Sequence, residues 1–245
     1  MKPLQTLRRR GWKGALALAR HRASELWHER RLGIRTAGKV ELPLLGIHDP
    51  HCKIYAPIAY RSFLAAIRHV TVVPGRDVFV DYGAGKGRVL VLAAGMPFAR
   101  VIGVEIAPAL AEAAEENLRR TGSRRRCGSV TVIRSNATVW ALDDEATVLH
   151  FFDPFRDDVL EATVEQIRLS LERAPRRITI LFADANHFDP LAARSGWIRA
   201  IRDVPYPYRE PGDAIRFMYR IYEAELPASR TRTTWPQARP TLGCS

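Results

Sequence analysis

The stretch Val78-Phe79-Val80-Asp81-Tyr82-Gly83-Ala84-Gly85-Lys86-Gly87-Arg88 decides how the chain is interpreted. A short apolar run predicts a buried strand over 77–81, and three alternate glycines predict a tight turn before a helix over 88–94. In a sheet of parallel strands, the turn after the first strand is a favoured ligand site, because glycines let the backbone approach a ligand closely. The stretch therefore predicts a binding loop at the carboxyl end of a parallel strand.

The spacing of the glycines separates this loop from two phosphate-binding loops. The dinucleotide fingerprint G-x-G-x-x-G would need its third glycine at position 88, which is Arg88. A P-loop needs Gly-Lys-Ser/Thr, whereas Lys86 is followed by Gly87. Asp81 also carries a negative charge directly before the loop, where it would repel a pyrophosphate. The ligand is therefore expected to be of another class.

Strand-like and helix-like patterns alternate along the chain on the C-terminal side of this loop. Such alternation predicts an α/β fold with a doubly wound, mostly parallel seven-stranded sheet and helices on both faces. Expected helices cover 59–70, 88–94, 108–120 and a segment with Leu160, Val164, Ile167 and Leu171 on one face. Expected strands cover 77–81, 100–105, 130–133, 147–152 and 177–183, with a closing antiparallel pair at 197–201 and 215–222.

The positive charge of the chain lies in its two ends. The net charge is +12, of which residues 1–40 supply +9 (11 basic against 2 acidic side chains) and residues 226–245 supply +3. These two segments account for the whole excess, so residues 41–225 are neutral. A neutral body argues against a nucleic-acid groove, because such a groove needs many phosphate-neutralising cations.

The N-terminal segment predicts a basic amphipathic helix. Apolar residues recur at steps of three and four, at Trp12, Leu16, Ala19, Ala23, Leu26 and Trp27, with arginines around them. Three interpretations are open: a structural arm that docks on the body, a helix that lies on an anionic membrane or a partner, and a cleaved targeting segment. No apolar run reaches 18 residues, so no transmembrane helix is expected. Three widely spaced cysteines predict a reducing compartment, and we expect a cytoplasmic, membrane-peripheral location.

The glycine loop resembles motif I of class I methyltransferases that depend on S-adenosylmethionine (SAM). The resemblance implies SAM as cofactor, bound by Asp81, Tyr82, Gly83, Ala84, Gly85 and Gly87. The methionine part of SAM carries an ammonium and a sulfonium, which a carboxylate at position 81 would attract. Glu105 ends the second strand, where an acid can accept both ribose hydroxyls, and Ile106 follows it. After the third strand, Asn136-Ala137 stands where the family has an acid on the adenine amino group.

A second motif follows the fourth strand. Asp153-Pro154-Phe155 resembles the Asn/Asp-Pro-Pro-Tyr/Phe motif of amino-directed methyltransferases, without the second proline. The stretch 55–197 is similar to a bacterial and mitochondrial group of protein-lysine methyltransferases related to the non-SET histone-lysine enzymes. The resemblance also covers Ile54-Tyr55-Ala56-Pro57, and it implies that Tyr55 closes the SAM pocket.

Asp153 departs from the asparagine that is usual in that group. A carboxylate favours the charged ammonium and so opposes formation of the neutral amine that a methyl transfer needs. Asp153 is therefore interpreted as a proton acceptor, or the acceptor is not lysine, or Asp153 caps the helix that follows. Together with the Pro154 carbonyl it could orient an amine, and Phe155 could form an apolar or cation–π wall.

The sequence therefore predicts a SAM-dependent N-methyltransferase whose acceptor is a protein lysine. Methylation of nucleic acid or of a small molecule, and a catalytically silent SAM-binding module, are the alternatives. The expected parts are a helical extension (1–40), the methyltransferase domain (41–225) and a flexible tail (226–245). No metal is expected, because the cluster His48-Asp49-Pro50-His51-Cys52 has no distant partner with ligand spacing. His150 is interpreted as a core histidine.

Overall fold

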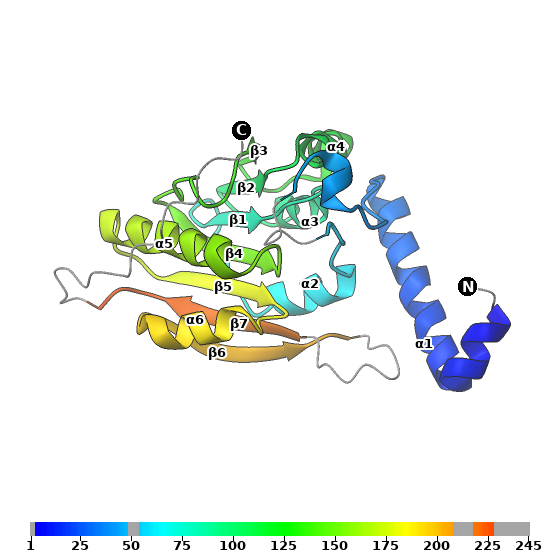
Figure 1. Cartoon of the computed structure of the whole chain (residues 1–245). Coiled ribbons are helices and arrows are strands. Elements are labelled where there is room, and N and C mark those ends of the chain that lie inside the picture. Colours follow the sequence, from blue (N-terminus) through cyan, green and yellow to red (C-terminus); the bar gives the residue numbers. More distant parts are fainter. Residues whose placement is uncertain (1–2, 49–53, 208–217, 228–245) are drawn as a thin grey trace.

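The computed structural model describes residues 3–48, 54–207 and 218–227, and Figure 1 shows the predicted α/β architecture. A seven-stranded sheet has the order β3-β2-β1-β4-β5-β7-β6. Neighbours among β1 to β5 are parallel, whereas β7 pairs antiparallel with both β5 and β6. The predicted doubly wound, mostly parallel sheet is therefore confirmed, including its closing antiparallel pair.

The elements follow the expected order along the chain. The strands are β1 (Val78–Tyr82), β2 (Arg100–Glu105), β3 (Ser129–Arg134), β4 (Ala146–Phe152), β5 (Ile178–Ala183), β6 (Ile198–Pro205) and β7 (Met218–Ala224). The helices are α1 (Pro3–Leu32), α2 (Tyr60–Ile67), α3 (Arg88–Ala94), α4 (Pro108–Arg120), α5 (Asp157–Arg173) and α6 (Phe188–Ser195), with short 3-10 turns at Leu42–Leu45 and Gly122–Arg124.

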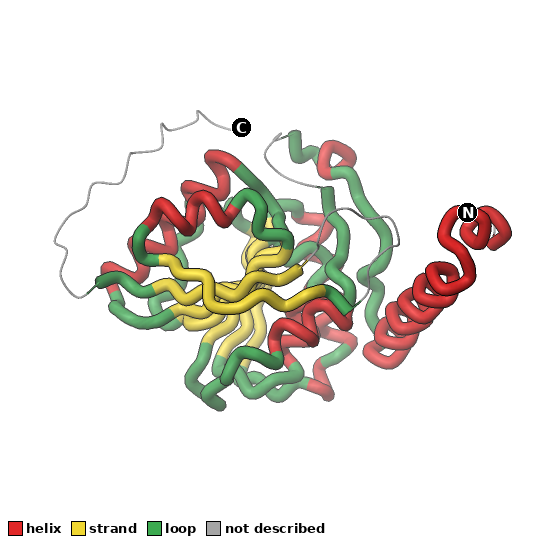
Figure 2. The backbone as a smooth tube through the Cα atoms, turned by 90° about the horizontal axis from the view of Figure 1, so that it is seen from below, coloured by secondary structure: helices red, strands yellow, loops and turns green. Residues whose placement is uncertain are grey.

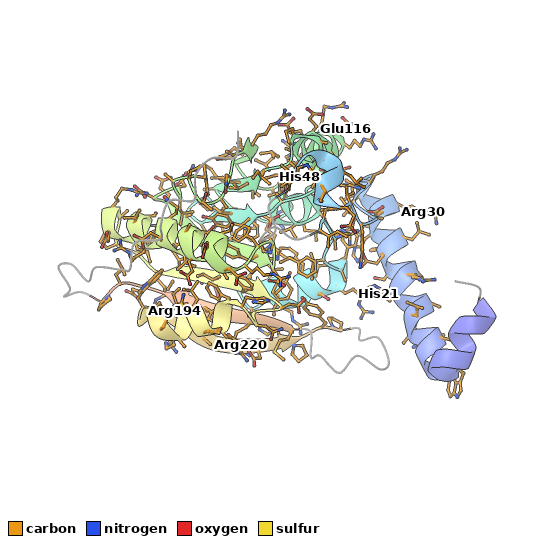
Figure 3. All side chains as sticks on the ribbon, in the orientation of Figure 1. His21, Arg30, His48, Glu116, Arg194 and Arg220 are labelled. Carbon is orange, nitrogen blue, oxygen red and sulfur yellow. The ribbon has the colours of Figure 1, made fainter. Side chains whose placement is uncertain are left out.

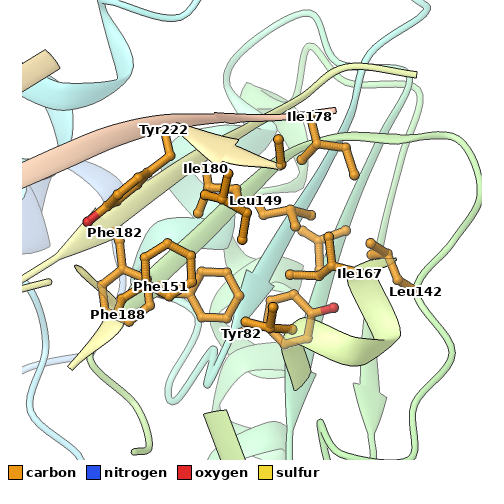
Figure 4. Packing of buried hydrophobic residues seen from close by; sticks show 14 of the residues in the cluster. Tyr82, Leu142, Leu149, Phe151, Ile167, Ile178, Ile180, Phe182, Phe188 and Tyr222 are labelled. Carbon is orange, nitrogen blue, oxygen red and sulfur yellow. The ribbon is translucent and has the colours of Figure 1, made fainter. Parts of the chain in front are cut away.

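Two apolar layers cover the two faces of the sheet. Figure 4 shows the layer under α5 and α6, where aromatic side chains such as Phe151, Phe182 and Phe188 stack on one another. The other layer lies under α2 and α3 and receives Phe63 and Phe79. Figure 2, viewed along another direction, shows helices on both sides of the sheet. Because successive strand residues point to opposite faces, neighbouring strand residues enter different layers.

The structure differs from the sequence prediction most clearly at the ends of two elements and in one additional helix. Helix α2 ends at Ile67, so the predicted end at Val70 is wrong. Strand β6 runs on to Pro205, beyond the expected end, and the expected residues 215–217 of the last strand lie outside the described residues. Helix α6 was not predicted, although Pro190 in its first turn is a position that helices tolerate.

Helix α1 confirms the predicted N-terminal helix and docks on the body through its polar side. His28 stacks on Tyr60 of α2 with ring centroids 4.7 Å apart. Glu25 and Glu29 accept hydrogen bonds from the guanidinium of Arg88, at 2.5 and 3.3 Å. Among the residues that the structure describes, no helix is long and apolar enough to cross a membrane.

Arg88, the first residue of α3, is buried and contacts several segments that lie far apart in the sequence. Its guanidinium also donates to Thr36 Oγ1 at 2.8 Å and to the Ile58 carbonyl at 2.7 Å, and it lies 4.1 Å above the Tyr60 ring. A buried cation has to be hydrogen-bonded and paired to be tolerated. The single side chain therefore ties α1, the segment after it and α2 to the glycine loop.

We expect Arg88→Met to lower the free energy of unfolding by about 3 kcal/mol, because it breaks a buried ion pair and several buried hydrogen bonds. Urea denaturation followed by circular dichroism measures this. The matched control is Arg100→Met, since Arg100 pairs with Asp143 and Glu145 but is 34% exposed. The free energy of unfolding of the control should fall by about 1 kcal/mol or less. Equal losses in the two variants would contradict the role assigned to Arg88.

Candidate active site

A cavity of about 250 Å³ opens at the carboxyl ends of β1, β2 and β4. This is where ligands bind in doubly wound sheets. Most of the residues that the sequence predicted for the site line this cavity: Tyr55, Asp81, Gly83, Ala84, Glu105, Ile106, Asn136, Ala137, Asp153, Pro154 and Phe155. The fold thus gathers residues from both predicted motifs and from the N-terminal side around one space.

Three predicted site residues lie behind this lining rather than in it. The side chain of Tyr82 points into the core under α5 and α6, where its ring stacks on Phe151 at 4.6 Å. Gly85 lies beneath the ring of Tyr55, and Gly87 is the residue before α3. These residues shape the loop, and none of the three lines the cavity.

Two glycines of the loop permit close contacts that any other residue would prevent. A Cβ on Gly83 would lie 2.7 Å from Cβ of Pro154, and a Cβ on Gly85 would lie 2.3 Å from Cε2 of Tyr55. Both glycines also have positive φ, 71° and 55°, which L side chains rarely adopt. The glycine spacing therefore lets the loop after β4 and the Tyr55 ring pack directly on the backbone of the glycine loop.

Asp81 is held by a buried hydrogen-bond chain. Its Oδ1 is 2.6 Å from Nδ1 of His150, whose Nε2 is 2.8 Å from the hydroxyl of Tyr219. All three side chains are buried, and Phe63 covers the imidazole edge-on at 5.4 Å. His150 also lines the cavity, so it is a core histidine, as predicted, and a site residue as well. The parallel register that places Asp81 beside His150 is a pairing of two strands that the sequence pattern does not give.

Glu105 closes the loop from the second strand. Its Oε2 accepts from the Gly85 amide at 2.7 Å, and its Oε1 accepts from the Ala107 amide at 2.9 Å. Burial raises the pKa of this carboxyl above its ordinary value. The two backbone amides fix the orientation of the Glu105 carboxyl group. Asn136 behaves similarly, since its Oδ1 accepts from the Thr138 amide at 3.0 Å.

Two aspartates lie at the ends of neighbouring strands and face the cavity. Asp153 follows β4 and Asp184 follows β5, and both have positive φ, 39° and 59°. Such a backbone is strained for a residue with a Cβ and is often found at functional sites. The proposed cap role of Asp153 is wrong, because α5 begins only at Asp157 and Arg156 is the residue before it. Asp184 was missed, since the sequence shows only an acid after an apolar strand.

The charges around the cavity favour a cationic ligand. Asp81, Glu105, Asp153 and Asp184 face it. Among the described residues that line it, the one Lys or Arg is Arg88, whose charge is met by Glu25 and Glu29. Opposite charges within a few ångströms favour the charged form of a ligand.

The structure shows no metal centre in the part of the chain that it describes, because no three His, Cys, Asp or Glu side chains gather there. Residues 49–53 of the cluster at His48 lie outside that part.

Comparisons with known proteins show the fold. No protein-family model and no curated protein matches the sequence. Among solved structures, the chain is similar to StiE O-MT, residues 961–1257, with a TM-score of 0.52 and 13% identity over 68% of this chain and 74% of that one. A putative transferase from Pyrococcus horikoshii gives a TM-score of 0.50 and 14% identity over 68% of this chain and 64% of that one. The chain thus has the Rossmann-like α/β fold of these transferases.

Proposed function

We propose that this protein is a SAM-dependent methyltransferase that methylates an amine nitrogen, that of a protein lysine. The observation that supports the proposal is the acid-lined cavity at the glycine loop. SAM brings a sulfonium and an ammonium, and a lysine brings a second ammonium. Four carboxyl groups and one already paired arginine suit such a pair of cations.

The residues of the cavity fit SAM in their chemistry. Asp81 would attract its ammonium, and Glu105, at the end of β2, would accept ribose hydroxyls. The carbonyl oxygen of Asn136 would accept from the adenine amino group, beside the apolar side chains of Ile106 and Ala137. Gly83 and Ala84 of the glycine loop line the same cavity. When bound, SAM supplies a methyl group that is activated by its sulfonium.

The loop after β4 would bind the acceptor. A lysine arrives as an ammonium, because its ordinary pKa is about 10.4. Asp153 and Asp184 attract this cation, and the amine then loses a proton to water. The Asp153 carboxylate and the Pro154 carbonyl accept the remaining amine hydrogens, which directs the nitrogen lone pair. Phe155 is held by its edge-on contact with Phe151 and forms an apolar wall.

A protein acceptor is favoured over a nucleic acid by charge. Residues 41–225 are neutral overall, and the cavity is acidic. A polyanion approaching this cavity would be repelled by the same carboxylates that attract a lysine.

The cofactor is tested by calorimetric titration with SAM, S-adenosylhomocysteine and NAD. We expect the wild-type protein to bind the two adenosyl ligands and not NAD. Asp81→Asn and Glu105→Gln should each weaken SAM binding about tenfold or more, because each removes a charged hydrogen-bond acceptor. Asp203→Asn, which affects a surface pair with Arg220, is the control. Binding of NAD, or unchanged SAM affinity in both site variants, would refute the assignment.

His150 is expected to act on SAM through Asp81. His150→Phe removes the imidazole that holds the Asp81 carboxylate, so SAM affinity should fall about tenfold. If His150 acts only by positioning Asp81, the double variant with Asp81→Asn binds SAM no more weakly than Asp81→Asn alone. Calorimetry of the four proteins of this cycle measures the coupling. Additive losses would show that the effect of His150 does not pass through Asp81.

Asp153 is expected to shift the pH dependence of transfer. Its negative charge raises the pKa of a bound ammonium, so the neutral amide of Asp153→Asn should move the acidic limb of the kcat profile to lower pH. Asp153→Ala should lower transfer about 100-fold, and SAM affinity should stay within about threefold. Initial rates on lysine-containing peptides across pH measure both effects.

The control for these rates is Asp158→Asn, an exposed aspartate in the first turn of α5. If Asp153→Asn loses as much activity as Asp153→Ala, the carboxylate is an obligatory proton acceptor and the orienting role is wrong. If wild-type protein binds SAM but methylates no peptide, protein or small amine, the silent binding module is the better description.

A further inference from the structure

Helix α1 has two faces with opposite surroundings. One face carries Glu25, His28 and Glu29, and it contacts Arg88 and Tyr60 of the body. Figures 1 and 2 show α1 beside the sheet domain, with its N-terminal half standing away from it. The side of α1 that the body covers therefore carries these polar groups together with Leu32, which packs on the layer under α2 and α3.

The predicted apolar stripe lies on the opposite face and is exposed to solvent. Trp12 is 67% exposed, Leu16 44%, Leu26 49% and Trp27 52%. Ala19 and Ala23 between them are exposed too. We call these six residues the outer stripe. Exposed side chains of this size in one continuous row mark an interaction surface rather than a structural contact. Helix α1 therefore docks on the domain, as the structural-arm interpretation predicts, and the stripe itself faces outward.

Basic side chains surround the outer stripe. At about 100° per residue, Arg20 and Arg22 fall on its two sides. Arg30 and Arg31 follow at its C-terminal end, and the Arg31 guanidinium lies 4.9 Å above the Trp27 ring. Figure 3 shows Arg30 on the outer side of α1 and His21 on the side that faces the body. The outward side thus combines apolar and cationic groups.

The acidic residues of the helix do not reduce this charge on the outward side. Glu25 and Glu29 are the two acids in residues 1–40, and both are paired with Arg88 on the docked face. The segment 1–40 has a net charge of +9. The outer face of the described part of α1 therefore presents cations without acids.

We propose that the outer stripe binds the surface of an anionic lipid bilayer, with α1 lying in the plane of the interface. Interfacial helices combine an apolar face with flanking Lys and Arg, and tryptophan prefers the interface. No helix that the structure describes could span the bilayer, which agrees with an in-plane position. Charge complementarity selects the lipid, because phosphate-bearing headgroups meet the arginines as the stripe enters the apolar layer.

Membrane binding would also orient the site. The docked face of the same helix holds Arg88, which lines the cavity and begins the helix after the glycine loop. A helix fixed in the membrane plane therefore holds the cavity at a defined side of that plane. This proposal does not depend on the methyltransferase assignment, since it concerns residues outside the cavity lining.

The test is sedimentation of the full chain with two kinds of vesicle. One is made of phosphatidylcholine alone, and in the other about 30% of the lipid is phosphatidylserine. We expect binding to the anionic vesicles that weakens with added salt. The variant Leu16→Ser/Leu26→Ser/Trp27→Ser should bind about tenfold or more weakly. The control Leu44→Ser/Val73→Ser/Val139→Ser removes three other exposed apolar side chains and should bind like wild type.

A second pair of variants tests the charges. Arg20→Glu/Arg22→Glu should bind about tenfold or more weakly than wild type. Arg76→Glu/Arg202→Glu, a reversal of the same size at exposed positions away from α1, should bind nearly as well. Circular dichroism and SAM titration of each variant show that the fold and the cavity are intact, so that a failure of one proposal is not read as a failure of the other.

Three results would overturn the proposal. The first is that wild-type protein binds neither kind of vesicle, and the second is that the stripe variant binds as tightly as its control. The third is concentration-dependent self-association in the absence of lipid, seen in analytical ultracentrifugation and lost in the stripe variant. In that case the outer stripe is an interface between two copies of this chain.

Discussion

The buried guanidinium of Arg88 is the constraint on which the arrangement around the cavity depends. A guanidinium that leaves water needs partners for its N–H groups and a counter-charge. Two carboxylates of α1, a hydroxyl of the following segment and a carbonyl before α2 supply them. Because Arg88 directly follows the glycine loop, these segments are brought to the same end of the sheet. These contacts with Glu25 and Glu29 also balance the charge of Arg88, the one Lys or Arg among the described residues that line the cavity.

Carboxylates are unusual in a buried or half-buried setting, and the four that line the cavity have their orientations set in three ways. Glu105 is held by two backbone amides, and Asp81 by an imidazole that a tyrosine hydroxyl holds in turn. Asp153 and Asp184 are aimed by a left-handed backbone at the ends of their strands. Groups fixed in this way need no reorganisation when charge arrives or develops next to them, which is how polar sites stabilise transition states.

The local features could be predicted from the sequence, and the contacts between distant segments could not. The strand, the glycine loop and the helix after it are neighbours in the chain, so their local pattern was sufficient to predict all three. His150 meets Asp81 across 69 residues, and Arg88 meets Glu25 across 63. These pairings depend on strand order and helix docking, which periodicity does not specify. For the same reason, the apolar stripe on α1 left open whether the helix docks on the body or on an outside surface. In the fold, α1 docks through the contacts of Glu25 and Glu29 with Arg88.

The two surfaces of α1 show why net charge alone is a poor guide to function. A total of +12 suggests a nucleic-acid partner, yet the body is neutral and the cavity is acidic. The excess lies in the two ends, and in α1 it accompanies exposed tryptophan and leucine. A polyanionic groove has no need of a row of apolar side chains, whereas a bilayer interface has a place for both kinds of group. The separation of an acidic cavity from a basic, apolar helix thus favours a small cationic ligand inside and an anionic surface outside.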